Sequence, residues 1–423
     1  MHDPRVFREQ LDQLRDAMRR RQKLDELAPL LERGATLELE RRTVIQAVEE
    51  RKAARNANSQ EVARRKKAGE SAEEQIAAGR QLGDEIQRLE NELAAAESEL
   101  RDILLSLPNI TLPDVPEGGE EANTVVRSWG EPRTSDGVRP HWEIGEERGL
   151  IDFTRGAKIS GSGFIVFRGL GARLTRALMN YFIDVHVGEN GYEEIWVPVV
   201  VNRASMIGTS QLPKFEEDMY ALKEEGMFLI PTAEVPVTNL HRDEILDGAT
   251  LPRGFVAYSP CFRREAGSAG KDTRGLLRVH EFDKVEMVHY CTPEQGEEVH
   301  ERMTRNAEVL LERLGLPHRR VLLSAGDTGF GAARCYDLEV WAPGVGKWLE
   351  VSSCSTFVDF QARRANIRYR PAPGEKPRFV YTLNGSGLAF PRIIAAILEH
   401  YQQPDGSVAV PDVLQPYLGV SVL

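Results

Sequence analysis

The hydrophobic residues before position 108 follow a helical repeat. They step alternately by four and three residues, at Leu82, Ile86, Leu89, Leu93, Ala96, Leu100, Ile103 and Leu107. This spacing, about 3.5 residues per step, is typical of a helix that winds around a partner helix. Because a second helical stretch precedes the repeat, residues 1–107 are predicted to form an antiparallel two-helix coiled-coil arm.

The pattern changes after Leu107. Residues 108–116 contain three prolines, which break helices, so we expect a linker over 108–125. Beyond it, runs rich in Val, Ile, Tyr and Phe are punctuated by Gly and Pro, which indicates strands and turns. Residues 126–423 are therefore predicted to form a second domain built on a β-sheet, and the fold class is α+β.

One helix and one strand stand out early in this second domain. An amphipathic helix is marked by Leu170, Leu174, Leu178, Tyr181 and Val185 and is broken by the glycines between 188 and 191. Residues 194–201 then read as a strand. Pro198 inside it lacks a backbone donor, which indicates a sheet edge or a bulge where another subunit packs, or with equal weight a simple strand end.

The segment 255–288 reads as strand, long loop and strand, and its polar pattern suggests a binding site. Alternation places Arg278, His280, Phe282, Lys284 and Glu286 on one face of the second strand, and Val279, Val285 and Met287 on the other. Arg263 and Glu265 share a face of the first strand. An aromatic ring within a row of charged side chains indicates a flat ligand that stacks on it.

The charge distribution limits the partners. The formal net charge is -11, so nucleic acid would have to be held by a local basic patch. Residues 41–67 hold nine basic residues against three acidic ones, whereas residues 70–102 hold ten acidic residues against three basic ones. The two stretches can pair with each other or can present a basic face to RNA, and the residues alone leave both interpretations open.

Several familiar sites are missing from the sequence. The four cysteines form no C-x-x-C pair and H-E-x-x-H is absent, which argues against structural zinc. Gly270-Lys271 is followed by Asp272, so it is not a Walker A loop, and Gly-x-Ser-x-Gly is absent. No apolar run approaches the roughly 20 residues that span a bilayer, and the charged amino terminus fits no leader, so we expect a cytoplasmic protein without membrane contact.

Three motifs resemble those of the class II aminoacyl-tRNA synthetases. Motif 2 is similar to Phe262-Arg263-x-Glu265, the loop after it and Arg278-x-x-x-Phe282. Motif 1 is similar to the helix, turn and strand that end at Pro198, and motif 3 to residues 383–392 with the helix that follows. More specifically, residues 208–215, 231–234, 267–275 and 350–355 resemble bacterial seryl-tRNA synthetases, and the resemblance extends to the arm.

The resemblance implies an antiparallel sheet flanked by helices, with a site for ATP, Mg²⁺ and L-serine. The implied catalytic residues are Arg263 at the α-phosphate, Glu265, and Arg392 at the γ-phosphate. The implied ATP ligands are Arg263, Arg264, Glu265, Val279, Phe282 under the adenine, Glu350, Val351, Ser352, Ser353 and Arg392. The implied serine ligands are Thr232, Ala233, Glu234, Arg263, Glu286 and Ser386. Glu350 and Ser353 are the implied Mg²⁺ ligands, with the oxygen donors that this ion prefers.

The implied reaction forms seryl-adenylate and then charges tRNA(Ser), and tRNA(Sec) where the organism has one, with the arm holding the tRNA and two copies forming a homodimer. Two rival interpretations remain. A ligase that loads an amino acid onto a carrier protein would lack the arm, which this chain keeps. A catalytically inactive RNA-binding dimer would have lost Arg263, Glu286, Glu350 or Arg392, and all four are present.

Overall fold

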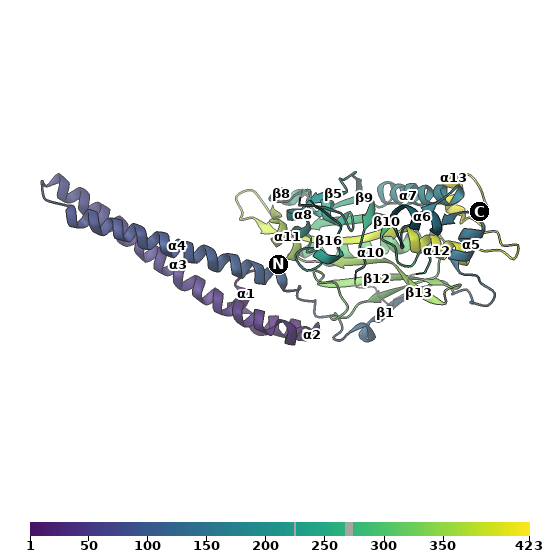
Figure 1. Ribbon diagram of the computed structural model, residues 1–423, viewed down its shortest axis with the longest axis horizontal. Coiled ribbons are helices and arrows are strands. Elements are labelled where there is room, and N and C mark those ends of the chain that lie inside the picture. The colour runs from purple at the N-terminus through teal and green to yellow at the C-terminus, as the bar shows by residue number, and fades with distance from the viewer. Residues whose placement is uncertain (224–225, 267–273) are drawn as a thin grey trace. The chain divides into compact units, whose positions relative to one another are not determined.

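The computed structural model describes residues 1–223, 226–266 and 274–423 and divides into two compact units, Met1–Pro108 and Asn109–Leu423. Figure 1 shows the first unit as a long pair of helices and the second as a sheet covered by helices. The chain as a whole, with a helical first unit and a second unit of strands and helices, is α+β, which confirms the fold class predicted from the sequence.

The first unit is an antiparallel helical hairpin. Its elements are α1 (Val6–Glu9), α2 (Leu11–Arg20), α3 (Leu24–Lys67) and α4 (Glu73–Ser106). Ladder residues Ile86, Leu100 and Ile103 on α4 are buried, as are Leu31 and Leu37 on α3. The 3.5-residue repeat therefore lies along the seam between α3 and α4, as expected for a coiled coil.

Opposite charges meet across this seam. The ion pairs between α3 and α4 are Arg33 Nε to Glu99 Oε1 at 2.7 Å, Arg41 Nε to Glu97 Oε1 at 3.0 Å, Arg51 Nε to Glu85 Oε2 at 2.7 Å, and Lys52 Nζ to Glu90 Oε1 at 2.7 Å. In the described parts of the chain, Arg42, Arg55, Lys66 and Lys67 form no ion pair. Ion pairs with α4 thus involve only part of the basic stretch over residues 41–67, and these four cations remain available to other partners.

The second unit is built on one eight-stranded sheet. Its strand order is β1 (Thr124–Trp129), β11 (His318–Leu322), β12 (Arg334–Ala342), β13 (Lys347–Thr356), β16 (Tyr381–Ala389), β10 (Glu281–Cys291), β9 (Arg253–Phe262) and β4 (Glu193–Glu194). All neighbours are antiparallel except β4, which runs parallel to β9 at the edge. Strands β13, β16, β10 and β9 occupy adjacent places, which brings three segments distant in sequence together.

Helices and three small sheets complete the second unit. The helices are α5 (His141–Glu147), α6 (Phe153–Ser160), α7 (Leu170–Gly188), α8 (Arg203–Gly208), α9 (Glu234–Thr238), α10 (Gly296–Arg313), α11 (Phe360–Ala365), α12 (Phe390–His400) and α13 (Gln415–Leu418). The small sheets are β5 (Val200–Asn202), β7 (Met227–Leu229) and β6 (Ala221–Leu222); β15 (Arg378–Phe379), β14 (Arg368–Arg370) and β8 (Ile245–Asp247); and β2 (Ile151–Asp152) with β3 (Val166–Phe167).

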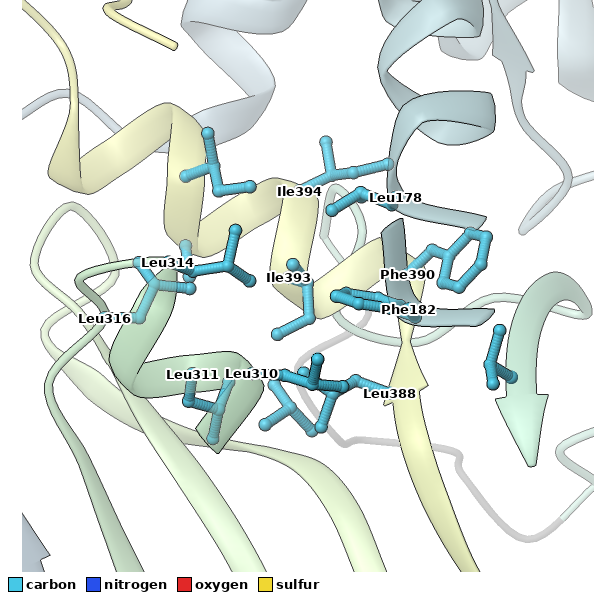
Figure 2. Close-up of a cluster of buried hydrophobic side chains, with 14 of the residues drawn as sticks. Leu178, Phe182, Leu310, Leu311, Leu314, Leu316, Leu388, Phe390, Ile393 and Ile394 are labelled. Atoms are coloured by element: carbon cyan, nitrogen blue, oxygen red, sulfur yellow. The ribbon is translucent and has the colours of Figure 1, made fainter. Parts of the chain in front are cut away.

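The main core lies where α7, α10 and α12 pack together beside the sheet. Figure 2 shows Phe182 of α7 next to Phe390 and Ile393 of α12, with Leu310 of α10 close by. The rings of Phe182 and Phe390 lie edge to face with their centroids 5.7 Å apart. This packing fixes the start of α12, whose first turn carries a residue that reaches the site described below.

The predicted elements near Pro198 are partly wrong. The helix over residues 170–185 is confirmed as α7, but the strand expected over 194–201 is split into β4 and β5. Pro198 lies in the break, where it donates no ladder hydrogen bond. Trp196 in the same break is 76% exposed, an unusual exposure for so large an apolar side chain.

Residues that the sequence assigns to a linker contact the second unit. Asn109 is buried, and its side-chain amide donates to the carbonyls of Gly331 at 2.9 Å and Phe357 at 3.0 Å. Its backbone amide donates to the carbonyl of Phe330. Hydrogen bonds therefore fix the chain at Asn109 to the rest of the second unit.

The four cysteines, Cys261, Cys291, Cys335 and Cys354, are all buried and unbridged. Burial raises the pKa of every one of these thiols, to about 12 for Cys291 and Cys354. Among the described residues, no helix combines the length and the apolar character that crossing a membrane requires.

Candidate active site

A cavity of about 640 Å³ opens on the sheet of the second unit. Its walls come from β10, β13 and β16, from Arg263 and Glu265 just after β9, from the segment before α9 and from the start of α12. That volume lies within the usual range for small-molecule sites. The neighbouring strand places of β13, β16, β10 and β9 therefore bring residues of motifs 2 and 3 to one cavity, whereas no residue of the motif 1 segment that ends at Pro198 is among its described lining residues.

Strand β10 presents the alternating face that the sequence predicts. Phe282, Lys284 and Glu286 line the cavity, whereas Val285 and Met287 lie in the main core. Alternation fails before the strand begins at Glu281. Val279, expected on the core face, lines the cavity instead, because residues ahead of a strand do not follow its period of two.

Arg263 lies at the mouth of the loop between β9 and β10. Its guanidinium carbon is 5.2 Å from the centre of the Phe282 ring, and its Nε donates to the Pro231 carbonyl at 3.4 Å. Two residues later, Glu265 accepts a hydrogen bond of 2.5 Å from Arg278. These contacts leave the rest of the Arg263 guanidinium and the Phe282 ring on the cavity wall.

Arg392 enters the cavity from the first turn of α12. Pro391 precedes it and needs no backbone donor there, so the helix can begin at this point. The side chain donates from Nε to the Leu277 carbonyl at 3.1 Å and from Nη1 to the Glu350 carbonyl at 2.7 Å. The positive end of the helix dipole adds to the guanidinium charge, which makes this a favourable place for an anion.

A second group of side chains is acidic and hydroxylic. Glu286 of β10 and Ser386 of β16 are paired directly across the two strands, and both are buried. Glu286 forms an ion pair with Lys284. Glu234, at the start of α9, is also buried, and the Thr232 hydroxyl accepts a hydrogen bond from its backbone amide at 3.2 Å. Carboxylates and hydroxyls so arranged suit a small ligand with an ammonium and a hydroxyl group.

The two carboxylates lie in different electrostatic surroundings. Burial, and after it the nearby negative charge of Glu286, raise the pKa of Glu234 to about 7, against the opposing effect of a hydrogen bond from Gln361. Glu286 instead has the ammonium of Lys284 beside it. At neutral pH Glu234 is therefore ionised only part of the time.

The residues expected to hold Mg²⁺ supply oxygen donors. Glu350 is partly exposed on β13, with its carboxylate 3.4 Å from Arg392 Nη1, and the Ser353 hydroxyl lies nearby on the same strand. Asp337 of β12 is paired across the sheet with Ser353, and burial together with the Glu350 charge raises its pKa well above the usual range. Acidic oxygens that crowd one another fit a divalent cation.

Most of the predicted site residues reach the cavity, but three do not. Arg264 is exposed and donates to the Glu217 carbonyl at 3.1 Å. Ala233 is fully buried, and the Ser352 hydroxyl donates to the Ser386 carbonyl at 2.6 Å, away from the cavity. The predicted motif over 267–275 falls largely on residues 267–273, which lie outside the described part of the chain.

The sequence missed other residues around the cavity. Lys284 had been placed on the right face without a role, and Asn384 of β16 lines the same wall. Gln361 of α11 and Thr382 of β16 lie behind Glu234 and are buried. No local motif marks these two, because their importance comes from a contact between residues 127 positions apart.

Comparisons with known proteins agree with this arrangement. Residues 215–401 match the family model described as tRNA synthetase class II core domain (G, H, P, S and T), and residues 1–111 match the Seryl-tRNA synthetase N-terminal domain. The serine–tRNA ligase of Gemmatimonas aurantiaca is 65% identical over 424 residues and covers 100% of both chains. That of Geobacillus kaustophilus is 53% identical and covers 99% of both.

Solved structures give the same result. The seryl-tRNA synthetase of Pyrococcus horikoshii, complexed with ATP, has a TM-score of 0.94 and 39% identity over 100% of this chain and 99% of its own. The cytoplasmic serine–tRNA ligase of Naegleria fowleri, in complex with AMP, has a TM-score of 0.86 and 29% identity over 100% and 98%. From its arm to its three motifs, the chain belongs to the seryl-tRNA synthetase family of class II aminoacyl-tRNA ligases.

Proposed function

We propose that the cavity joins L-serine to ATP and that the seryl group then passes to the 3′ end of tRNA(Ser). One observation carries this proposal: a single cavity holds guanidinium groups suited to phosphates, on Arg263 and Arg392, together with the buried carboxylates of Glu234 and Glu286, suited to an ammonium and a hydroxyl group. Family membership supplies the reaction, and the side chains named here are the ones assigned to it.

In the first step, a carboxylate oxygen of serine attacks the α-phosphorus of ATP. A P–O bond forms there, the bond to the bridging oxygen breaks, and pyrophosphate leaves. The attacking carboxylate is already ionised, so no general base is needed, and catalysis consists of positioning and charge stabilisation. We assign Arg263 to the α-phosphate, Phe282 to the adenine ring and Arg392 to the γ-phosphate.

Glu350 and Ser353 are the residues proposed to hold Mg²⁺. When bound there, the ion neutralises phosphate charge. This proposal fits a site in which the protein supplies few ligands, because Mg²⁺ keeps several waters and binds substrate phosphates as well. Among the described residues, no group of three or more His, Cys, Asp or Glu side chains is placed to hold a metal by itself.

In the second step, the 3′-hydroxyl of the terminal adenosine attacks the carbonyl carbon of the adenylate and AMP leaves. We assign the recognition of tRNA(Ser) to the arm, where Arg42, Arg55, Lys66 and Lys67, which form no ion pair with any described residue, can contact backbone phosphates. tRNA(Sec) is proposed as a second substrate wherever it occurs.

Exposed Trp196 beside Pro198 supports a homodimer through this face, and a cytoplasmic location is proposed for the enzyme.

Serine-dependent exchange between pyrophosphate and ATP tests the first step directly. We expect exchange with serine and none with glycine or alanine at equal concentration, followed by serylation of tRNA(Ser). A protein that binds tRNA without catalysing exchange would be an inactive relative. Exchange without transfer to tRNA, but with transfer to a carrier protein, would identify a carrier ligase.

A further inference from the structure

A buried chain of hydrogen bonds lies behind Glu234. The Thr382 hydroxyl donates to Gln361 Oε1 at 2.7 Å, and Gln361 Nε2 donates to Glu234 Oε1 at 2.6 Å. The exposed fractions of Thr382, Gln361 and Glu234 are 0%, 1% and 8%. These hydrogen bonds connect residues of β16, α11 and α9 in series and end at one carboxylate oxygen of Glu234.

Chemistry fixes the direction of this chain. An ionised carboxylate can only accept, so the amide nitrogen of Gln361 must face Glu234 and its carbonyl oxygen must face away. The Thr382 hydroxyl then has to donate to that oxygen. Thr382 therefore selects the orientation of the Gln361 amide, and the amide occupies one of the two oxygens of Glu234.

We propose that Gln361, oriented by Thr382, is a positioning residue that holds Glu234 Oε1 and leaves Oε2 to bind the ammonium group of serine. The inference rests on the proposed function, because it assumes that Glu234 lies in the serine pocket. It adds residues outside the cavity wall to those that determine how the amino acid binds.

The position of Gln361 has a consequence for charge. The charged groups that face Glu234 are Glu286 and Lys284 from β10 and Arg263 after β9. The pKa of Glu234 is raised to about 7 because burial and the charge of Glu286 outweigh the Gln361 hydrogen bond, which lowers it by favouring the ionised form. Below this pH Glu234 is protonated and cannot pair with an ammonium, so serine binding strengthens as the pH rises through about 7.

Removing the Gln361 amide should therefore shift this dependence. Without the donor, the Glu234 pKa rises further, and at neutral pH less of the enzyme has the ionised form that binds serine. Gln361→Met keeps a similar volume and removes both polar atoms. We expect its serine KM near neutral pH to rise about tenfold or more, since hydrogen bonds to charged groups are the strong ones.

The experiment measures serine KM, ATP KM and kcat by exchange from about pH 6 to about pH 8.5. For Gln361→Met we expect unchanged ATP KM, a raised serine KM, and a smaller difference from wild type at the alkaline end. Titration calorimetry of serine in two buffers of different ionisation enthalpy should show proton release on binding near pH 7. Thr382→Val should move serine KM the same way but less, and Thr382→Ser should restore it.

Gln402→Met is a matched control, because Gln402 is also buried and hydrogen-bonded, to Arg139, but lies outside the cavity. It should keep the wild-type serine KM at every pH. The inference would be overturned if serine KM rose by the same factor at all pH values in Gln361→Met. It would also be overturned if both Gln361→Met and Thr382→Val kept the wild-type serine KM. If Gln361→Met does not fold, Thr382→Val against Thr382→Ser decides the question. Wild-type protein without serine-dependent exchange would instead overturn the proposed function.

Discussion

At the scale of single residues, the cavity separates two kinds of charge. Arg263 lies over the Phe282 ring and Arg392 lies at a helix start, so both cations face a region suited to a nucleotide. Glu234 and Glu286 are buried with different neighbours, an amide for one and a lysine for the other. Carboxylates whose surroundings differ in this way usually take different roles.

Arg263→Ala should lower the rate of serine-dependent exchange by two orders of magnitude or more. A charge-stabilising contact that strengthens in the transition state contributes on the order of 3 kcal/mol. Arg264→Ala is the neighbouring control: its side chain is exposed and bound to the Glu217 carbonyl, so its exchange rate should stay near wild type. Equal losses of exchange rate in both variants would mean that Arg264 also acts in the site, as the family resemblance had implied.

Glu286→Gln should raise serine KM and narrow the preference for serine over alanine together. A buried polar group placed for a substrate hydroxyl is left unpaired when alanine binds, and sites of this kind discriminate by roughly 10⁴ to 10⁵ in kcat/KM. The substitution keeps the volume and removes the charge beside Lys284. Steady-state exchange with both amino acids measures the ratio, and an unchanged ratio would place Glu286 outside the amino-acid pocket.

At the scale of helices and strands, periodicity explains what could be predicted and where prediction stopped. The ladder on α4 and the alternation in β10 repeat within one element, so Ile86, Phe282 and Glu286 could be placed from the sequence alone. The alternation pattern misplaced Val279 because the strand begins after it, whereas the family resemblance had named it among the ATP ligands. Gln361 was missed because its partner comes from another element, and such contacts leave no local pattern.

Arm cations divide into those paired across the seam and those that are not, and only the second group should bind RNA. Replacing Arg55, Lys66 and Lys67 by Gln should weaken tRNA binding and flatten its salt dependence, because each lost phosphate contact lowers the slope by about 1. Arg51 and Lys52, which pair with Glu85 and Glu90, provide the comparison. Their replacement by Gln should leave the slope nearly unchanged. Isotherms of tRNA binding over a range of salt concentrations measure the salt dependence of both variants. Identical slopes would mean that ion pairing across the seam does not decide which cations contact RNA.

At the scale of the whole molecule, the exposed Trp196 is the clearest sign of a partner. It is 76% exposed, and its ring lies 5.7 Å from that of Tyr258 on the edge of the sheet. A large aromatic residue in water beside an edge strand is a common anchor of interfaces. If this face joins two copies, the residue should be covered in the dimer.

Trp196→Ser should therefore weaken self-association. Loss of an interface aromatic costs about 2 kcal/mol or more, which raises the dimer Kd by roughly thirtyfold. Sedimentation velocity over a dilution series measures the change. Leu39→Ser removes another apolar side chain, 65% exposed on the arm, and should leave the dimer intact. Unchanged sedimentation of Trp196→Ser would place the interface elsewhere.

Because all four cysteines are buried, thiol reagents should react only slowly with the native enzyme. Thiolates are the reactive species, and buried thiols with raised pKa values supply few of them. A single cysteine introduced at exposed Ser71, in the turn between α3 and α4, would thus be the preferred site for a maleimide dye. One fluorophore could then report on tRNA arriving at the arm without removal of any native cysteine.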